Sequence, residues 1–580
     1  MKTKKLVAVL LASMSLSIVG MTACNGGGNQ QGNNNNTVVA SDKVCNIQLF
    51  KGGYGVDWIY ELKSNFERVY AEEGYKINVL QPSYDMKGST AQQMMYMGYE
   101  ENGVDLYIVG DLYPNGVGAN GNYGVIAEDI EKTVYELPAI NFSGEEEGQP
   151  ISAKLSPDVV PYTKDENGVM YGFNWTQSIS GLVVNTKKLS AYGLEKPKTT
   201  NELFDCFDKI YRGHNGQGNS GETKVYPIVY VSGSNGYTTS YLETVLAQYG
   251  MEEYQSFWNM LDEEGEYRLE DGYEVFAEDN ILEMLNIAYR TFDVTIACPG
   301  TLQMTVDKAQ AAIMKSSNKA NAVFMFNGDW MLNEVKLNYP NNLNDIEFIN
   351  CPVNSAVGKK LFGKGTSHNM SDADCEALLT YMIDLVDQNK SLEEIVMAVK
   401  TDKGITIAVE EAEQVANARG VYTSRGVEHM AYIAKNAGGK KVAELVLRMM
   451  ASNDFAEIYS KHANGTTPYA SSINNTTSYK FVKQASEIAV NQYVRIVAGR
   501  TSGLRGKLPL GNMLSTQAHL PYYISTLPTN TSPTIYTLDY KLNGKDIQVY
   551  RDAAAALQQR DYENVKKNWN TYLTNAGLNK

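Results

Sequence analysis

The sequence predicts a large α/β protein, and two observations carry this prediction. The chain has 580 residues and is 43% hydrophobic, which is enough for two or more domains with large cores. Near its start, residues 44–50 have a strand pattern, residues 57–71 a helical pattern and residues 75–80 a second strand pattern. A strand, helix and strand in this order join parallel strands, so the body begins as a parallel α/β domain.

The helix over 57–71 follows from its apolar spacing, because Trp58, Leu62 and Phe66 fall on one face at about 3.6 residues per turn. A second unit follows, with a helix near 91–100 and a strand over 104–109. The α/β pattern therefore continues as far as residue 109.

The end of the chain is predicted to be helical. Residues 441–450 form an amphipathic pattern, Ser452 is placed to cap the helix that follows, and a last helix covers about 552–573. Residues 400–420 are harder to place; they are helix-like around 409–418, and we interpret the region as an insertion.

A secretion signal precedes these elements. Three lysines, an apolar run over 6–20 and small residues before Cys24 are typical of a cleaved signal, and the run is shorter than the roughly 20 residues that span a bilayer. The pattern resembles a bacterial lipoprotein signal over 1–23, with Cys24 as the lipidated first residue. Residues 25–36 are only Asn, Gly or Gln, so we expect 24–42 to be a disordered tether. The body would then be lipid-anchored on the extracellular face of the cell membrane.

Charge and cysteine content exclude several classes of protein. The net charge is −15 and becomes more negative without the signal, which holds three Lys and no acid. This argues against nucleic acid and anionic lipid as partners, and favours a neutral or cationic ligand. The cysteines form no CxxC pair, so one disulfide and five buried thiols both stay open. They lie at positions 24, 45, 206, 298, 351 and 375.

No catalytic, metal or cofactor motif stands out. The five His are scattered and form neither HxH nor HExxH, and the chain has neither a GxSxG elbow nor a Walker A loop. We therefore expect no catalytic residue, no metal and no cofactor. Among 66 acidic residues, a glycosidase carboxylate pair is not excluded by spacing alone.

Three segments, taken in order, resemble one known family. The first is Tyr171–Asn185, the second combines Ala311–Met314 with Phe326–Trp330, and the third is Val442–Tyr459 followed by Asn464–Pro468. Together they resemble the extracellular solute-binding proteins of sugar ABC transporters, the maltose-binding-like family.

The resemblance implies a two-lobed periplasmic-binding-protein-like fold of type II. Each lobe is then a mixed or parallel sheet flanked by helices, and hinge strands join the lobes. The first crossing would lie near Tyr171–Trp175 and the second near the strand that leads to Cys351. The implied lobes are residues 43–165 with about 346–480, and residues 166–345 with about 481–580.

The resemblance also implies a function. A membrane-anchored monomer would capture a carbohydrate, expected to be an oligosaccharide, and deliver it to the permease subunits of an ABC transporter, without chemistry. Ligand would sit between the lobes, which close around it. Two alternatives stay open: an extracytoplasmic glycan-degrading enzyme, and a binding protein of the same fold for another solute such as a peptide.

Candidate ligand-binding residues follow from what a sugar offers, namely hydroxyls and flat apolar faces. Trp330 is the first choice for stacking on a sugar ring, against the alternative that it fills the core. Asp329 precedes it in a Gly-Asp turn, where an acid is often solvated or capping. Asp111 follows the strand over 104–109, at the edge where α/β sheets bind ligands, although it also suits a turn before Pro114.

Further candidates lie in loops at the same expected edge. Tyr54 stands among glycines after the first strand, where a flexible turn is an equal alternative. Trp175 and Gln177 lie in the first crossing and either line the cleft or stiffen the hinge. Later loops supply Asn235, with Ser234 and Tyr237 beside it, and Tyr522, with Tyr523 beside it.

Overall fold

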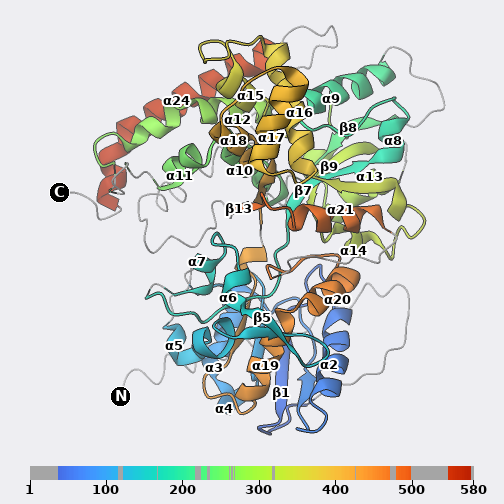
Figure 1. Cartoon of the computed structure of the whole chain (residues 1–580), viewed down its shortest axis with the longest axis vertical. Helices are drawn as coiled ribbons and strands as arrows, with labels where there is room; N and C mark the ends of the chain where they lie inside the picture. Colours follow the sequence, from blue (N-terminus) through green and yellow to red (C-terminus); the bar gives the residue numbers. More distant parts are fainter. Residues whose placement is uncertain are drawn as a thin grey trace. The chain divides into compact units, whose positions relative to one another are not determined.

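The structure is a computed structural model in which residues 37–580 form one compact unit. Two main sheets organise this unit, and Figure 1 shows the helices gathered around each. The predicted signal, Cys24 and most of the tether lie outside the described residues. The structure describes residues 37–575 apart from 115–121, 166, 216–223, 232–235, 260–261, 263–265, 267, 316–320, 425, 470–478 and 498–546.

The first lobe is built on a five-stranded sheet in the order β2-β1-β3-β12-β6. β1 pairs in parallel with β2 and β3, whereas β12 pairs antiparallel with both β3 and β6. The predicted parallel start is therefore confirmed, and a strand from late in the sequence completes the sheet. The strands are β1 (Val44–Leu49), β2 (Lys76–Val79), β3 (Leu106–Ile108), β6 (Phe173–Asn174) and β12 (Met430–Ile433).

Amphipathic helices cover the first sheet. α2 buries Trp58, Leu62 and Phe66, the stripe expected from the sequence. Ser452 caps α20, because its hydroxyl accepts the backbone N–H of Phe455 at 3.1 Å. The other elements of this lobe include a small hairpin of β4 and β5. Their bounds are α2 (Asp57–Val69), α3 (Gly88–Met97), α4 (Tyr99–Asn102), α5 (Tyr123–Ile126), β4 (Pro138–Ile140), β5 (Glu146–Pro150), α6 (Ile151–Lys154), α7 (Val160–Thr163), α19 (Lys440–Met450) and α20 (Asn453–Ala463).

The second lobe is built on a four-stranded sheet in the order β10-β7-β9-β8. β8 and β9 are parallel, and β7 is antiparallel to both of its neighbours. The strands are β7 (Ser180–Asn185), β8 (Tyr226–Val229), β9 (Ala322–Gly328) and β10 (Ile346–Ile349). The helices around this sheet are α8 (Thr186–Ser190), α9 (Thr200–Asn215), α10 (Gly236–Tyr249), α11 (Met251–Asn259), α12 (Asp279–Thr291), α13 (Val306–Met314), α14 (Met331–Val335), α21 (Lys480–Ala489) and α24 (Ile547–Asn575).

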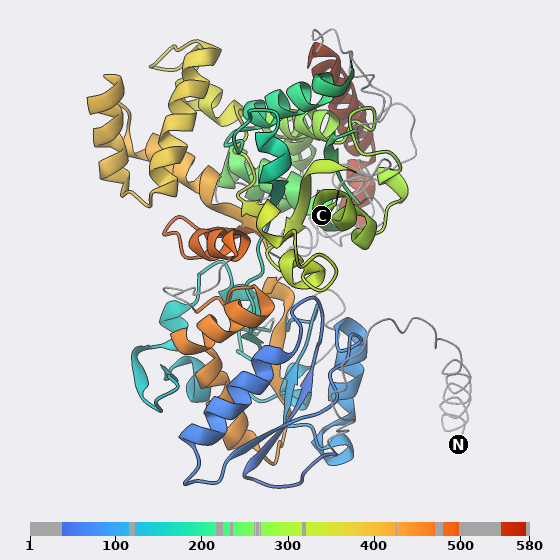
Figure 2. The same cartoon turned by 90° about the vertical axis from the view of Figure 1, so that its right-hand side faces the viewer.

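A helical bundle is inserted into the second lobe after β10. Its helices share a core of their own, which runs from Val353 to Ala418 and includes Leu379 and Val415. The bundle packs against α10, and Figure 2 shows it in yellow and gold beside the sheet. The insertion expected over 400–420 is thus the last part of a longer one. Its helices are α15 (Ala356–Phe362), α16 (Asp372–Asp387), α17 (Leu392–Ala398) and α18 (Val409–Gly420).

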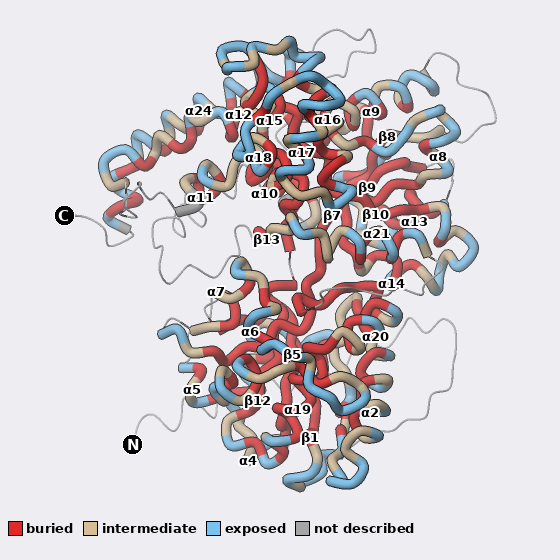
Figure 3. Tube along the Cα trace, viewed as in Figure 1, coloured by how far each residue is buried: buried red, intermediate tan, exposed pale blue. Residues whose placement is uncertain are grey.

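Two segments, described apart from residue 425, carry the chain between the lobes. Trp175–Ile179 links β6 to β7, and Ser424–His429 links β11 (Val421–Thr423) to β12. β11 itself pairs with β13 (Arg495–Val497) on the side of the second lobe. Figure 3 shows the buried trace continuing from one sheet to the other through these segments. Because the chain crosses more than once, each lobe is discontinuous in sequence.

The two crossing segments are paired with each other, and we call this pair the hinge. Ile179 and Ser424 form an antiparallel bridge. The Ser424 hydroxyl donates to the carbonyl oxygens of Ser178, at 2.7 Å, and of Gln177. The N–H of Gln177 donates to the carbonyl of Thr466 at 2.9 Å, so the chain after α20 is tied to the same place.

The predicted fold class, two α/β lobes joined by crossing strands, is confirmed, but the predicted lobe boundaries need two corrections. Residues 346–424 belong with the second lobe, because β10 pairs with β7 and the inserted bundle packs on α10. Residues 167–174 belong with the first lobe, because β6 pairs with β12. The second crossing therefore lies at Ser424–His429 rather than near Cys351.

The five described cysteines are all buried and unpaired, which settles the choice between a disulfide and free thiols. None of the described helices has the length and apolar character needed to cross a membrane.

Gly426 allows the crossing segments to approach closely, and its replacement tests the hinge. A Cβ on this residue would lie 2.3 Å from the carbonyl oxygen of Gln177, much closer than atoms pack. We expect Gly426→Ala to lower the free energy of unfolding by about 1–3 kcal/mol through overpacking. Urea denaturation followed by circular dichroism measures the loss.

Gly213→Ala is the matched control. Its Cβ would meet only the edge of the half-buried Tyr192 ring, at 2.9 Å, and a side chain can shift more easily than the backbone carbonyl that Gly426 faces. A loss of stability in the control equal to that of Gly426→Ala would contradict a special constraint at the hinge.

Candidate functional site

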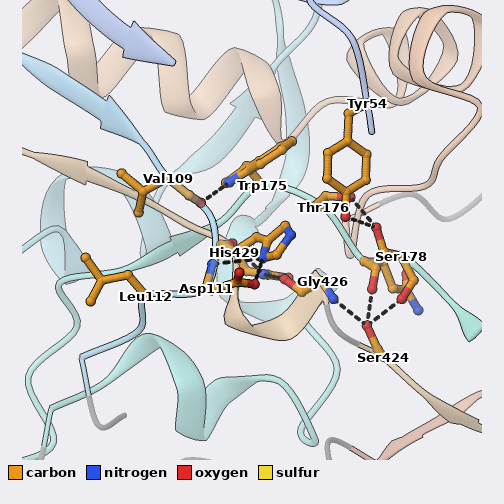
Figure 4. Close-up of polar contacts among 12 residues, drawn as sticks. Tyr54, Val109, Asp111, Leu112, Trp175, Thr176, Ser178, Ser424, Gly426 and His429 are labelled. Carbon is orange, nitrogen blue, oxygen red and sulfur yellow. Dashed lines mark hydrogen bonds and ion pairs between the residues drawn. The ribbon is translucent and has the colours of Figure 1, made fainter. Parts of the chain in front are cut away.

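Loops from both lobes meet beside the hinge. From the first lobe come the loop after β1, with Tyr54, and the loop after β3, with Asp111. From the second lobe comes the turn after β9, with Asp329 and Trp330. Each loop follows the carboxyl end of its strand, which is the edge where α/β sheets hold ligands. We call this region the interlobe site, and Figure 4 shows its first-lobe side with the hinge.

Tyr54 joins the first lobe to the hinge. Its hydroxyl lies 2.7 Å from the hydroxyl oxygen of Ser178, in a crossing segment. Its ring stands edge-on to Trp175 and to His429, with centroid distances of 5.2 Å and 5.7 Å. Burial raises the pKa of Tyr54 well above its usual range, so it acts here as a neutral hydrogen-bonding ring.

Trp175 is part of the core, and the structure corrects the prediction that it stacks on ligand in the cleft. The side chain has no exposed surface. Its indole N–H donates to the carbonyl of Val109 at 3.0 Å, and its ring is nearly parallel to those of Trp58 and His429. These contacts satisfy its polar atom and cover the ring, so it anchors the crossing segment in the first lobe.

Gln177 also serves the hinge rather than the cleft. Only 6% of the residue is exposed. Its backbone N–H donates to Thr466, in the chain after α20, and its carbonyl accepts from Ser424 in the other crossing segment. The hypothesis that Trp175 and Gln177 stiffen the hinge therefore fits the structure better than the hypothesis that they line a cleft.

Asp111 remains accessible at the expected sheet edge. Its side chain is 44% exposed. Its φ of 49° is uncommon for a residue other than glycine, and a backbone of this kind often marks a functional position. The geometry leaves a carboxylate that can accept ligand hydroxyls.

His429 is a site residue that the sequence did not indicate. The backbone N–H of Asp111 donates to its Nδ1 at 3.2 Å, so Nδ1 is an acceptor and the ring proton sits on Nε2. The contact of 3.6 Å between Nδ1 and the Asp111 carboxylate is therefore not an ion pair. One His among five scattered ones gave no signal, because the side chains that surround it, such as Tyr54 and Trp175, lie far away in the sequence.

Trp330 belongs to the second lobe but packs against the core of the first. It is only partly buried, and its ring centroid lies 6.1 Å from that of Tyr237. Gly53 makes this approach possible, because a Cβ there would lie 3.2 Å from Cδ1 of Trp330. Asn333 strengthens the contact by donating to the carbonyl of Gly53 at 2.5 Å. Trp330 is thus a contact between the lobes with part of its surface open.

Asp329 is fully buried beside Trp330, which differs from the solvated or capping carboxylate that such a turn favours. Its backbone N–H continues the sheet by donating to the carbonyl of Ile179 at 3.0 Å. Neither of its carboxylate oxygens has a hydrogen-bond partner among the described residues. Burial raises the pKa of Asp329 to about 8. The nearby backbone N–H groups favour the charged form only weakly, because none of them makes a well-formed hydrogen bond to the carboxylate.

Two of the predicted ligand-binding residues lie outside the described residues. They are Asn235, with its neighbour Ser234, and Tyr522, with its neighbour Tyr523. Tyr237 is described and stands near Trp330, which places the start of α10 at the interlobe site. In the described part of the chain, no group of three or more His, Cys, Asp or Glu is arranged to hold a metal ion.

A cavity of about 600 Å³ lies elsewhere in the second lobe, between α21 and residues 194–198. Its charges already pair with one another: Lys196 contacts Glu347 at 2.7 Å, and Arg419 forms a two-bond contact with Asp387. Its aromatic side chains are buried, so it lacks the open ring that a sugar site needs.

Comparison with known proteins gave distant structural likenesses. No family model and no curated protein matches the chain. The apo form of RafE from Streptococcus pneumoniae is 12% identical with a TM-score of 0.49, over 92% of this chain and 100% of that one. A probable secreted solute-binding lipoprotein from Streptomyces coelicolor is 12% identical with a TM-score of 0.49, over 90% and 99%.

A third structure, maltose-bound MalE3 of T. maritima, is 13% identical with a TM-score of 0.45, over 89% of this chain and 99% of that one. The fold described above rests on the chain's own sheets and crossings.

Replacing each tryptophan separates the anchoring role from the contact role. We expect Trp175→Ala to lower the free energy of unfolding by about 3–5 kcal/mol, because it removes a fully buried ring and its hydrogen bond. Trp330→Ala is the comparison and should cost clearly less, since its ring is partly exposed. Chemical denaturation measures both, and equal losses would contradict the distinction.

Proposed function

We propose that this chain is the extracytoplasmic receptor of a sugar ABC transporter. The observation that carries the proposal is the interlobe site, where Trp330 from one lobe meets the Tyr54 loop of the other beside the paired crossings. A ligand held there would contact both lobes, so binding and closure would be one event.

The chemistry of the interlobe site suits a carbohydrate. Trp330 and Tyr237 offer rings for the flat apolar face of a sugar, and Asp111 offers a carboxylate for its hydroxyls. The negative net charge of the chain favours a neutral ligand over an acidic one. Sugars are also the ligand class that the family resemblance implies.

The hinge supplies the motion that a receptor needs. The crossing segments bond to each other through Ser424, so they would bend together and the lobes would turn as rigid bodies. We propose that ligand shifts the population towards the closed form, by as much as it binds that form more tightly. The permease subunits would then receive the closed, loaded receptor.

The predicted signal and tether would hold the receptor at the membrane. We propose that Cys24 carries the lipid and that residues 25–36 form a tether spanning roughly 20 Å. A monomeric receptor tethered in this way stays close to its membrane partner and remains free to open and close.

Calorimetry against neutral oligosaccharides tests the proposal. We expect binding by the unmodified chain and a loss of more than tenfold in affinity in Trp330→Ala, because stacking on that ring is removed. The matched control is Tyr96→Ala on α3, which removes another exposed aromatic ring without touching the interlobe site. Both variants should keep their far-UV circular dichroism.

Two results would overturn the proposal. Conversion of the oligosaccharides to shorter products would make the protein a glycan-degrading enzyme. Binding of peptides with no affinity for any neutral glycan would assign the fold to another solute.

A further inference from the structure

Asp329 is a buried acid of the interlobe site. The residue has no exposed surface, and neither carboxylate oxygen is hydrogen-bonded among the described residues. A carboxylate that leaves water without gaining hydrogen bonds is strongly disfavoured in its charged form. The residue therefore either carries a proton in this arrangement or lowers the stability of the arrangement.

Asp329 is buried where the two lobes meet. It stands at the end of β9 in the second lobe, beside Trp330, which packs against the core of the first lobe. Tyr54, in the loop after β1, and Tyr459, on α20, belong to the first lobe. Burial is the main cause of the raised pKa of both tyrosines, and the charge of Asp329 adds to it. Opening of the lobes would separate these groups and admit water to the carboxylate.

We propose that Asp329 gates closure: its charged carboxylate holds the empty receptor open, and the lobes close when a ligand hydroxyl or a proton satisfies it. The inference rests on the proposed receptor function, because it assumes lobes that open and close. It makes Asp329 a residue that selects ligands able to donate hydrogen bonds.

The pH dependence of closure follows from burial. An aspartate in water has a pKa of about 4, and burial in the closed arrangement raises the pKa of Asp329 to about 8. The closed form thus binds the proton more tightly, so closing the empty receptor takes up a proton and becomes easier as pH falls. Between these two values, each unit of pH changes the ratio of closed to open molecules about tenfold.

Other titratable groups face the same contact and must be separated from Asp329. Tyr54 and Tyr459 stay neutral well above this range, since burial raises the pKa of each. Glu334 on α14 is the closest rival, because it faces Gly53 and burial raises its pKa as well. It differs from Asp329 in accepting a hydrogen bond of 2.6 Å from Gln310. Asp111 keeps 44% of its side chain exposed.

Small-angle X-ray scattering of the full-length chain in detergent, without ligand, tests the gate. Between pH 8 and pH 5 the wild type should become more compact, with a smaller radius of gyration. Asp329→Asn has no charge to bury, so it should be more compact than the wild type at pH 8 and change little with pH. Glu334→Gln should keep the pH response of the wild type.

The outcomes are decisive because circular dichroism reports on folding in every sample. Equal radii for Asp329→Asn and wild type at pH 8 would overturn the gate, as would loss of the pH response in Glu334→Gln alone. Asp329→Ala replaces Asp329→Asn if the amide does not fold. The scattering experiment contains no sugar, so a negative result there would not contradict the receptor proposal. Likewise, a failure to bind sugar would not change what the scattering shows about Asp329.

Discussion

The pairing of the two crossing segments is the interaction on which the rest of the structure depends. Ser424 donates to the carbonyls of both Gln177 and Ser178, and the bridge between Ile179 and Ser424 joins the segments directly. Neither segment can bend alone without breaking these bonds. The φ of 40° at Ser178 is a further sign that the backbone is held in a specific shape at this point.

The interlobe site is built outward from this pair. Tyr54 reaches the hinge through Ser178, Trp175 fixes its crossing segment to the first lobe through Val109, and Asp329 continues the sheet by bonding to Ile179. A ligand that contacts Trp330 or Asp329 therefore acts close to the axis of movement. Small changes in contact there are turned into a rotation of whole lobes, because the cores on either side are densely packed.

The sequence predicted local elements well and long-range arrangement poorly. The helix over 57–71 agrees with α2 at Asp57–Val69, since its periodicity is a local property. The second crossing was predicted too early in the chain because the pairing of β10 with β7 joins residues some 160 apart. The helical bundle inserted after β10 also separates that strand from the point where the chain returns to the first lobe.

The candidate site shows the same limit. The sequence offered both Trp175 and Trp330 as candidate ligand-binding residues. In the structure Trp175 is enclosed by Trp58 and His429, whereas Trp330 bridges the lobes. The exposure of each side chain is set by residues that lie far from it in the sequence. For the same reason the burial of Asp329 contradicted the usual behaviour of an acid in a turn.

The five buried thiols have a practical consequence. Burial raises the pKa of Cys45, Cys206, Cys298, Cys351 and Cys375, so little reactive thiolate forms at neutral pH. The described cysteines should therefore not react with maleimide dyes. A pair of cysteines introduced on the surface, one in each lobe, would be the reactive thiols of this body, and fluorescence energy transfer between two attached dyes would report lobe movement in single molecules.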